Sequence, residues 1–516
     1  MQQRGEGMAV TRIAVLDIGS YELKLEIFEI NKEVITSIDC VRHILALGKE
    51  TYTTGKISYE SLDEICGVIE GFCRIMKTYQ VEDYRAYSGS AIREASNSTI
   101  VLDQIKVRTG IEVRVISNSE HRFLLYKGIA RKNLSFFNMI EEGTAIVDVG
   151  AGSIQISLFD KGSLVTTQNI RLGSLRILEL LHGIGNDINS RALILELVDN
   201  DIDTFKKFFL KDRPIKNVIG IGDGLLYLMK KRKDSEEVTS ITSEQFQNIY
   251  EKIIKMSIEE IEDYFDIPAG YATMILPSAI MYKKMMDEAK AERMWIPNVD
   301  FCDGIIADYA EKKKLICVEH DFSKDILSAA RVIAKRYMTN KGHTQILEDS
   351  VCKLFDAMKK YHGLGKRERL LLQISAILHD CGKYINMGLP GDCAYNIIMS
   401  TEIIGLSHKE REMVANIVKY NTIPFPSYTE FQGKLSEKAY LVVLKLTAIL
   451  RLGNAMDRSH KQKFKHMKVT VKNRELIITT DTLLDITLES GLLESKAKFF
   501  EEVYGIRPVL KKRKGV

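Results

Sequence analysis

The sequence predicts an α/β protein in which two similar domains are followed by an all-α domain and a small α/β cap. Three observations carry this prediction. The stretch AVLDIGSYELKLEIFE, residues 14–29, returns without a gap as AIVDVGAGSIQISLFD, residues 145–160. Beyond residue 321 these hairpin patterns stop and apolar residues at helical spacing begin, as in SKDILSAARVIAKRYM. Over residues 461–516 polar and apolar residues alternate again, which is typical of strands.

Composition places the chain among ordinary globular proteins. Its 516 residues suffice for several domains, and a hydrophobic share of 45% with only 8 prolines is unlike a disordered chain. The net charge of +4 is too small to indicate specific binding of nucleic acid. The eight cysteines form no CxxC pair, which predicts reduced thiols in the cytoplasm. We find no run of 18 apolar residues and no signal-peptide core, so we expect no membrane segment.

Each copy of the repeat predicts a strand, a tight turn and a second strand. An apolar run ends in Asp-x-Gly, and alternating residues follow. Gly19 and Gly150 permit close backbone approach, so the consecutive N–H groups after each glycine can form a nest for an anion. Asp17 and Asp148 would lie beside these nests, where a carboxylate can hold a hydrated Mg²⁺ ion. Each hairpin is therefore predicted to be half of a phosphate clamp.

The duplication implies that the two α/β domains face each other across a ligand cleft. A single glycine after a buried strand is more often just a turn. Because the pattern occurs twice without a gap, we favour the clamp over two unrelated turns.

The loops LDIGS, residues 16–20, and VDVGAGS, residues 147–153, resemble the phosphate loops of the sugar-kinase, heat-shock-chaperone and actin superfamily. More narrowly, the chain resembles the exopolyphosphatase and guanosine pentaphosphatase family. Further segments follow in that family's order: SGSAIREASN (88–97), VISNSEHRFLLYKG (115–128), RLGSLRILE (171–179), VIGIGDG (218–224) and YATMILPSAIMYKKMM (271–286).

This resemblance implies two ribonuclease-H-like domains, at residues 1–133 and 134–310. It also implies a homodimer, and Mg²⁺-dependent release of terminal orthophosphate from inorganic polyphosphate or from guanosine pentaphosphate. The partners that it implies are polyphosphate and guanosine pentaphosphate or tetraphosphate. A polyphosphate chain needs an extended basic channel and a nucleotide needs a base pocket. The sequence does not choose between these substrates.

Chain-end cleavage of a phosphoanhydride needs positive charge, N–H donors, a positioned water and a carboxylate that orients or deprotonates it. The resemblance assigns Glu120 as this catalytic carboxylate and Arg93 as a bidentate phosphate ligand. Taken alone, Glu120 would more often stabilise a helix start. The full set of predicted cleft residues is Asp17 and Asp148 for Mg²⁺, and Gly19, Ser20, Arg93, Gly150, Gly152, Ser153 and Gly222 for phosphate.

Five residues depart from the family pattern. Tyr21 and Glu22 replace Asn-Ser in the first loop, placing a ring and a negative charge near the phosphate path. Gln155 replaces a glutamate after the second loop, and His121 replaces an acid beside the catalytic position. Asp223 stands where the family has a second glycine. Either the site uses a different metal arrangement or substrate, or the protein binds these ligands as a sensor without hydrolysing them. The retained residues favour hydrolysis, and Glu120→Gln is then expected to abolish phosphate release.

The segment ILHDCGKYI, residues 377–385, resembles the signature of HD-domain metal-dependent phosphohydrolases. With His379 and Asp380, the positions of His343 and Asp457 fit the four ligands of such a domain, which we place at residues 311–460. We expect at most one divalent ion, such as Mn²⁺. The alternatives are a helical domain used for dimer contacts and a substrate channel, or an HD domain that is the only active centre.

Residues 461–516 predict a small α/β cap. The stretch KHMKVTVKNRELIITT reads as two strands joined by a turn at KNRE, and a helix containing SKAKFFEEVYG follows. Four lysines precede or begin the first strand and could line the path of a polyanion, although solvated surface charge is the simpler interpretation. They are Lys461, Lys463, Lys465 and Lys468.

Overall fold

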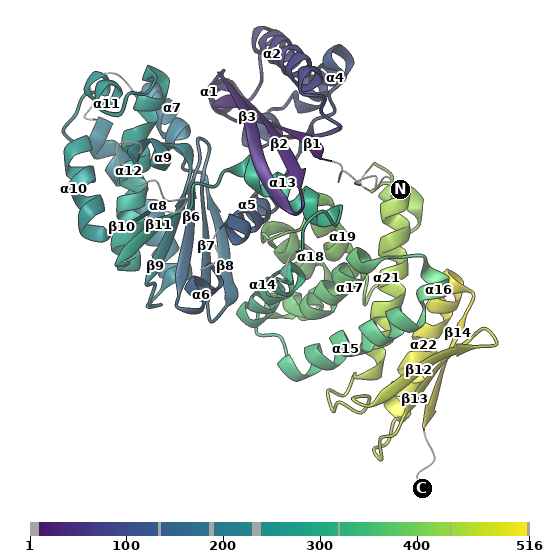
Figure 1. The fold of residues 1–516 in the computed structure, drawn as a ribbon. Coiled ribbons are helices and arrows are strands. Elements are labelled where there is room, and N and C mark those ends of the chain that lie inside the picture. Colours follow the sequence, from purple (N-terminus) through teal and green to yellow (C-terminus); the bar gives the residue numbers. More distant parts are fainter. Residues whose placement is uncertain are drawn as a thin grey trace, which may run out of the picture. The chain divides into compact units, whose positions relative to one another are not determined.

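The computed structural model describes residues 10–132, 136–184, 190–229, 239–317, 320–433 and 435–512. The chain forms two compact units, Met1–Asp321 and Phe322–Val516 (Figure 1). The first unit contains two sheets and the second contains one. The sequence placed the start of the helical part at residue 311, but α13 (Phe301–Lys312) still belongs to the first unit.

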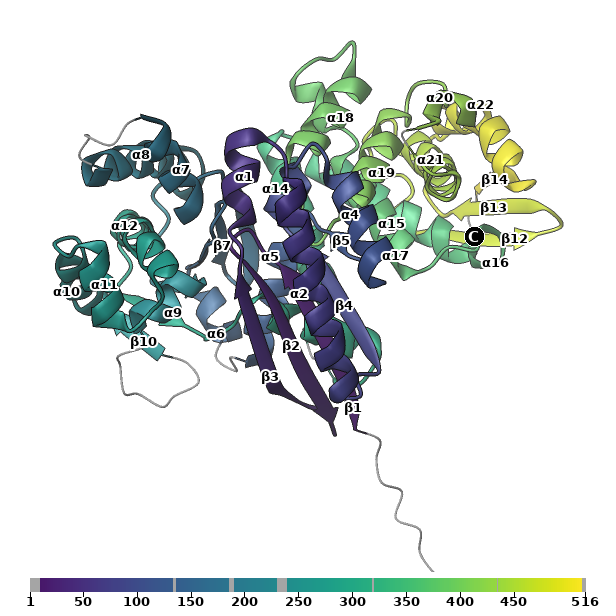
Figure 2. The same ribbon diagram turned by 90° about the horizontal axis from the view of Figure 1, so that it is seen from above.

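The first sheet forms lobe I of the first unit and has the order β3-β2-β1-β4-β5. β1 pairs antiparallel with β2 and parallel with β4. The helix α2 packs against this sheet, as Figure 2 shows from above. The strands are β1 (Thr11–Ile18), β2 (Glu22–Asn31), β3 (Val34–Ile44), β4 (Asp83–Ser88) and β5 (Arg114–Val115), and the helices are α1 (Leu47–Thr54), α2 (Tyr59–Thr78), α3 (Ser90–Glu94), α4 (Ser98–Thr109) and α5 (Asn118–Lys132).

The second sheet forms lobe II and repeats this topology. β6 pairs antiparallel with β7 and parallel with β9, as β1 does with β2 and β4, and the whole order is β10-β11-β9-β6-β7-β8. The strands are β6 (Thr144–Val149), β7 (Ile154–Asp160), β8 (Ser163–Ile170), β9 (Asn217–Ile221), β10 (Thr239–Thr242) and β11 (Arg293–Ile296). The helices are α6 (Phe136–Glu141), α7 (Ser174–Ile184), α8 (Ser190–Phe205), the π-helix η1 (Lys206–Leu210), α9 (Asp223–Met229), α10 (Ser243–Ile253), α11 (Ile258–Phe265) and α12 (Ala269–Ala289).

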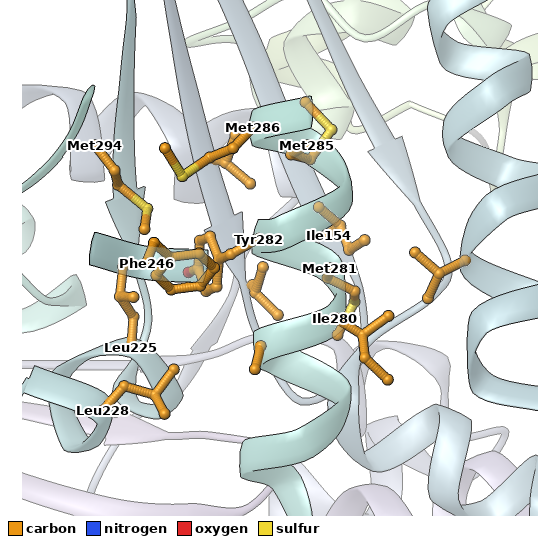
Figure 3. Close-up of a cluster of buried hydrophobic side chains, with 14 of the residues drawn as sticks. Ile154, Leu225, Leu228, Phe246, Ile280, Met281, Tyr282, Met285, Met286 and Met294 are labelled. Carbon is orange, nitrogen blue, oxygen red and sulfur yellow. The ribbon is translucent and has the colours of Figure 1, made fainter. Parts of the chain in front are cut away.

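A methionine-rich core packs α12 against the sheet of lobe II. Met281 and Met285 of α12 are fully buried, and Figure 3 shows their side chains beside those of neighbouring elements. Methionine fills irregular gaps well because its side chain is unbranched and flexible. Tyr282 on the same helix donates a hydrogen bond to the carbonyl of Ile221 at the end of β9. The core therefore fixes the backbone from which the Gly222 loop begins.

The helix α13 returns from lobe II to lobe I, where it packs on α5 and β1. The approach to α5 is close: a Cβ atom on Gly304 would lie 2.3 Å from the carbonyl oxygen of Leu124, so only glycine fits there. Lys127 of α5 adds ion pairs to Asp308 at 2.8 Å and Glu311 at 2.5 Å of α13. The end of the predicted second domain is thus part of the packing of the first lobe.

The second unit packs helices around α21, and a three-stranded sheet follows them. β13 lies between β12, which is antiparallel to it, and β14, which is parallel. The elements are α14 (Phe322–Arg336), α15 (Lys341–Ala357), α16 (Lys359–His362), α17 (Lys366–Leu378), the 3₁₀ helix η2 (Cys381–Tyr384), α18 (Pro390–Ser400), α19 (His408–Lys419), α20 (Tyr428–Phe431), α21 (Glu437–Met456), β12 (Met467–Lys472), β13 (Glu475–Thr480), α22 (Thr487–Tyr504) and β14 (Arg507–Lys512).

Among the described residues, α21 is the one helix whose length and composition would allow it to cross a membrane. Of its most apolar stretch, 67% is buried inside the unit, as in the core helix of a folded domain.

Candidate active site

The two repeated loops adopt the same turn. In lobe I the N–H of Gly19 donates to the carbonyl of Glu22 at 2.9 Å, and in lobe II the N–H of Gly150 donates to that of Ser153 at 3.0 Å. A Cβ atom on Gly19 would lie 2.9 Å from the Glu22 oxygen, so the turn leaves room only for glycine. The sequence repeat therefore corresponds to a repeated backbone structure at the end of β1 and of β6.

Two further glycines bring other segments against the second loop. A Cβ atom on Gly173 would lie 2.3 Å from the carbonyl oxygen of Ala151, and the N–H of Ser174 donates to the carbonyl of Gly150 at 3.1 Å. Gly222 has a φ of +131°, and a Cβ atom there would lie 2.5 Å from the carbonyl oxygen of Val149. The segments RLGS and IGDG thus form part of the same site.

A cavity of about 210 Å³ lies between the loops of the two lobes. Both lobes contribute to its wall. The structure brings together at this cavity all the residues predicted to bind phosphate or the cleft ion: Asp17, Gly19, Ser20, Arg93, Asp148, Gly150, Gly152, Ser153 and Gly222. The guanidinium of Arg93 is held in place because it donates to the carbonyl of Ile116 and to Oδ1 of Asn118, both at 2.6 Å.

Of the residues predicted for the cleft, Glu120 is the one that does not line this cavity. It lies in the first turn of α5, where its carboxylate accepts hydrogen bonds from the N–H and the hydroxyl of Ser117, both at 3.0 Å, and pairs with Arg114. The Ser117 hydroxyl in turn accepts from the N–H of Glu120 at 3.3 Å. This reciprocal arrangement is a capping box. The role of Glu120 in catalysis stays a prediction.

The carboxyl group of Asp148 is buried in the cavity wall, and Asp17 is half-buried there. Burial and the charge of Asp300 raise the pKa of Asp17 to about 7. Burial and the charge of Asp223 raise the pKa of Asp148 to about 7. Crowded carboxylates in a dry site are stabilised by a divalent cation, and oxygen donors suit Mg²⁺. The donor set therefore fits the predicted cleft ion, with Asp17 and Asp148 as its candidate ligands.

Tyr21 and Glu22 line the cavity and contact lobe II. The ring of Tyr21 packs edge-on against Tyr271 with centroids 5.0 Å apart, and Tyr271 donates a hydrogen bond to Glu22. Arg42 pairs with Glu22 at 2.8 Å and with Asp223 at 3.3 Å. A single cation on β3 therefore pairs with both of the negative charges that depart from the family pattern.

His121 and Gln155 lie together beside Asp148. Gln155 Nε2 lies 3.3 Å from His121 Nδ1, which lies 3.8 Å from Asp148 Oδ2. The imidazole stacks on Phe301 with centroids 4.4 Å apart. Burial and the charges of Arg93 and Arg122 lower the pKa of His121 to about 3, so the ring is neutral.

Several residues at the cavity were not predicted as site residues. Lys24 pairs with Asp300 and, at 2.6 Å, with Glu26, so a buried cation lies below the first loop. The Tyr52 hydroxyl donates to Ser20 Oγ at 2.9 Å and lies 3.0 Å from Ser90 Oγ. In the sequence Lys24 alternates with leucines, and acidic residues lie two positions away on either side of it. This pattern is typical of a solvated strand face, so nothing in it indicates a buried ion pair. Nothing local in the sequence points to Tyr52.

A second cluster of titratable residues lies in the helical unit. His343 Nε2 and His379 Nε2 are 3.1 Å apart, and Asp380 Oδ1 lies 3.3 Å from the His379 nitrogen. These three predicted ligands are therefore within reach of a common ion. Asp457 instead lies 2.8 Å from the other nitrogen of His343, and His460 stacks on that ring with centroids 4.0 Å apart.

Known proteins resemble both units. The model of the Ppx/GppA phosphatase family matches residues 26–313, and that of Ppx/GppA phosphatase, domain III, matches residues 327–498. A guanosine-5'-triphosphate,3'-diphosphate pyrophosphatase of Photobacterium profundum is 18% identical over 90% of this chain and 91% of its own length. Exopolyphosphatase 1 of Mycobacterium tuberculosis is 25% identical over 28% of this chain and 42% of its own length.

A crystal structure of an exopolyphosphatase from Cytophaga hutchinsonii has a TM-score of 0.53 and 19% identity, and the match covers 60% of this chain and 100% of that chain. This likeness and the repeated sheet topology identify an actin-like α/β fold. Because the family model matches more than half of the residues of this chain, the chain belongs to the Ppx/GppA phosphatase family.

Proposed function

We propose that the cleft of the first unit hydrolyses a terminal phosphoanhydride bond and releases orthophosphate, in a reaction that depends on a divalent cation. The observation that carries this proposal is that two loops with the same turn meet at one cavity with Arg93, the buried Asp148 and the half-buried Asp17. Phosphoryl transfer needs little beyond positioning and charge stabilisation, and these groups supply both. The names of the relatives support hydrolysis over a sensor without activity.

Different residues of the cavity bind the phosphate and the ion. The loops at Gly19 and Gly150 and the guanidinium of Arg93 hold the terminal phosphate. An ion at Asp17 and Asp148 would neutralise charge on the phosphate oxygens.

Water attacks the terminal phosphorus, the bond to the bridging oxygen breaks, and a chain shorter by one phosphate leaves. Glu120 is the proposed base for the proton of this water. To reach the cavity it would exchange its contacts with Ser117 and Arg114 for the water.

We propose inorganic polyphosphate or guanosine pentaphosphate as the substrate class, since the relatives' names point to these two. Release of orthophosphate from each substrate with Mg²⁺ tests the function. The parent should act on at least one of them, whereas Asp148→Asn and Arg93→Gln should lose at least about 100-fold in rate. Asp63→Asn is a matched control, because Asp63 pairs with Arg108 on the surface of lobe I. A folded parent protein that releases no orthophosphate from either substrate would overturn the proposal.

For the helical unit we propose one bound divalent ion, such as Mn²⁺, in an HD-type site. His379 Nδ1 lies 2.7 Å from the carbonyl of Ala376, so this nitrogen carries the proton and Nε2 presents a lone pair. His343 Nδ1 faces Asp457, so its Nε2 presents a lone pair as well. Two acceptor nitrogens 3.1 Å apart beside the carboxylate of Asp380 repel one another unless a cation lies between them.

A further inference from the structure

The strands β6 and β7 place two oxygen-bearing side chains side by side in lobe II. Asp148 and Gln155 are direct partners in the antiparallel ladder, so their side chains point to the same face of the sheet. Both line the cavity. His121 of α5 reaches the same place, with its Nδ1 lying 3.8 Å from Asp148 Oδ2 and 3.3 Å from the Gln155 amide.

The amide oxygen of Gln155 has no hydrogen-bond partner. The residue is only 8% exposed, and its Oε1 atom is buried. An unsatisfied buried acceptor costs about 1–3 kcal/mol unless a ligand occupies it. The Nδ1 atom of His121 faces the NH₂ group of the same amide, so this nitrogen acts as an acceptor there. A carboxylate, an amide group and an imidazole nitrogen thus lie together at one side of the cavity, with the amide nitrogen facing the imidazole.

We propose that Asp148, Gln155 and His121 bind a first-row transition-metal ion such as Mn²⁺ or Co²⁺ in preference to Mg²⁺. Ligands that bind one such ion at about 2.0–2.2 Å in adjacent positions are about 3 Å apart. His121 Nδ1 lies 3.8 Å from Asp148 Oδ2, so binding an ion would draw these two atoms closer together. Half a turn of the Gln155 amide exchanges its oxygen and nitrogen and directs the oxygen toward His121. The imidazole itself keeps its position, because it is stacked on Phe301.

The preference follows from the donor atoms. Mg²⁺ favours oxygen ligands and draws much of its binding from carboxylate charge, whereas an imidazole nitrogen favours transition metals. A glutamate at position 155, which the resemblance leads one to expect, would give two carboxylates. Gln155 leaves one carboxylate, and His121 adds a nitrogen. The inference rests on the proposed function only in that the ion would serve the same cavity.

Metal binding to the full-length protein tests the inference without reference to activity. The cluster in the helical unit would also take up metal, so all variants are made in a His379→Ala background. Binding of Mn²⁺ is measured by calorimetry with and without Mg²⁺ in excess, and Co²⁺ is used as an optical probe of nitrogen coordination. We expect one Mn²⁺ per chain that Mg²⁺ displaces poorly.

Two variants should each reduce this preference, one by weakening Mn²⁺ binding and the other by strengthening Mg²⁺ binding. His121→Leu should weaken Mn²⁺ binding about tenfold or more and alter the Co²⁺ spectrum, and Gln155→Glu should strengthen Mg²⁺ binding by a similar factor. The control is His182→Gln, which removes an exposed histidine from α7 and should change neither quantity. The proposal would be overturned if the parent binds Mn²⁺ and Mg²⁺ with equal affinity. It would also be overturned if folded His121→Leu binds Mn²⁺ as tightly as the parent does.

Circular dichroism shows whether His121→Leu folds, and if it does not, Gln155→Glu decides alone: unchanged Mg²⁺ affinity in that variant contradicts the proposal. Orthophosphate release is assayed separately with each ion. Preferential Mn²⁺ binding without release from any substrate would contradict the proposed function and leave the metal site standing. Release of orthophosphate with Mg²⁺, without preferential binding of Mn²⁺, would contradict the metal preference and leave the proposed function standing.

Discussion

The guanidinium carbon of Arg176 lies 3.8 Å from the ring centroid of Tyr52, so a cation of lobe II stacks on an aromatic ring of lobe I. Arg176 also donates to the carbonyl of Gly152 at 2.9 Å and pairs with Glu94 of lobe I at 2.9 Å. The hydroxyl of Tyr52 reaches Ser20 in the first loop. One arginine and one tyrosine therefore connect the two phosphate loops, and they hold the lobes together where the substrate would bind.

Replacement of Arg176 by alanine should weaken this connection. The variant loses the cation–π contact, the hydrogen bond to Gly152 and the ion pair with Glu94, so its free energy of unfolding should fall by about 1–3 kcal/mol. The KM for the phosphate substrate should rise as well, because the loops lose their shared support. Urea unfolding and steady-state kinetics measure the two effects.

Tyr52→Phe is the matched control for that prediction. It keeps the ring under Arg176 and removes only the hydroxyl that contacts Ser20 and Ser90, so its stability should stay within about 1 kcal/mol of the parent. If Arg176→Ala is as stable as the parent, the stacking does not hold the lobes together.

The capping box at α5 makes Glu120→Gln a clean test of catalysis. Glutamine is accepted at this position of a capping box, so the helix start should remain intact. A glutamine side chain cannot take a proton from water, and orthophosphate release should therefore be abolished while the melting temperature stays close to that of the parent. Activity equal to that of the parent would show that Glu120 only caps the helix.

The ion pair between Lys127 and Asp308 predicts a dependence of stability on pH. Burial opposes ionisation of Asp308, but the charges of Lys127 and Lys312 outweigh it and lower its pKa below the ordinary value. Such a carboxylate stabilises the fold above its unfolded-state pKa of about 4, and this contribution is lost as the pH falls through the folded-state pKa. Asp308→Asn should thus be less stable than the parent by about 1–3 kcal/mol at pH 7, and the difference should shrink toward pH 3.

Chemical denaturation of the full-length protein at both pH values measures this difference. Asp63→Asn, which removes an exposed ion pair with Arg108, should cost less than about 1 kcal/mol. A deficit of Asp308→Asn that is the same at pH 3 and pH 7 would mean that packing, and not charge, is lost.

The sequence predicted those parts of the site that are encoded locally. The turns at Gly19 and Gly150 follow from a glycine after an apolar run, and their repetition predicted the two sheets. Contacts between distant segments could not be predicted from the sequence. Lys24 and Asp300 are separated by 276 residues, and only the return of α13 to lobe I brings them together. The departures at Tyr21 and Glu22 were visible, but their orientation depends on Tyr271 and Arg42, which no local pattern connects to them.

In the cluster of the helical unit we predict different effects for His379 and for Asp457, which contacts the other nitrogen of His343. We expect His379→Ala to lower the divalent metal content of the protein by one ion per chain, because it removes one of three converging donors. Asp457→Asn should retain the ion but bind it about 10–100-fold more weakly, since Asp457 holds the proton-bearing nitrogen of His343 and so orients the other nitrogen. Elemental analysis after dialysis, and competition with a chelator, distinguish the two effects. His408→Ala, at the start of α19, is the control and should keep the parent's metal content. If His379→Ala keeps the parent's metal content, the cluster does not bind a metal ion. If Asp457→Asn loses the ion as completely as His379→Ala does, Asp457 is a direct ligand.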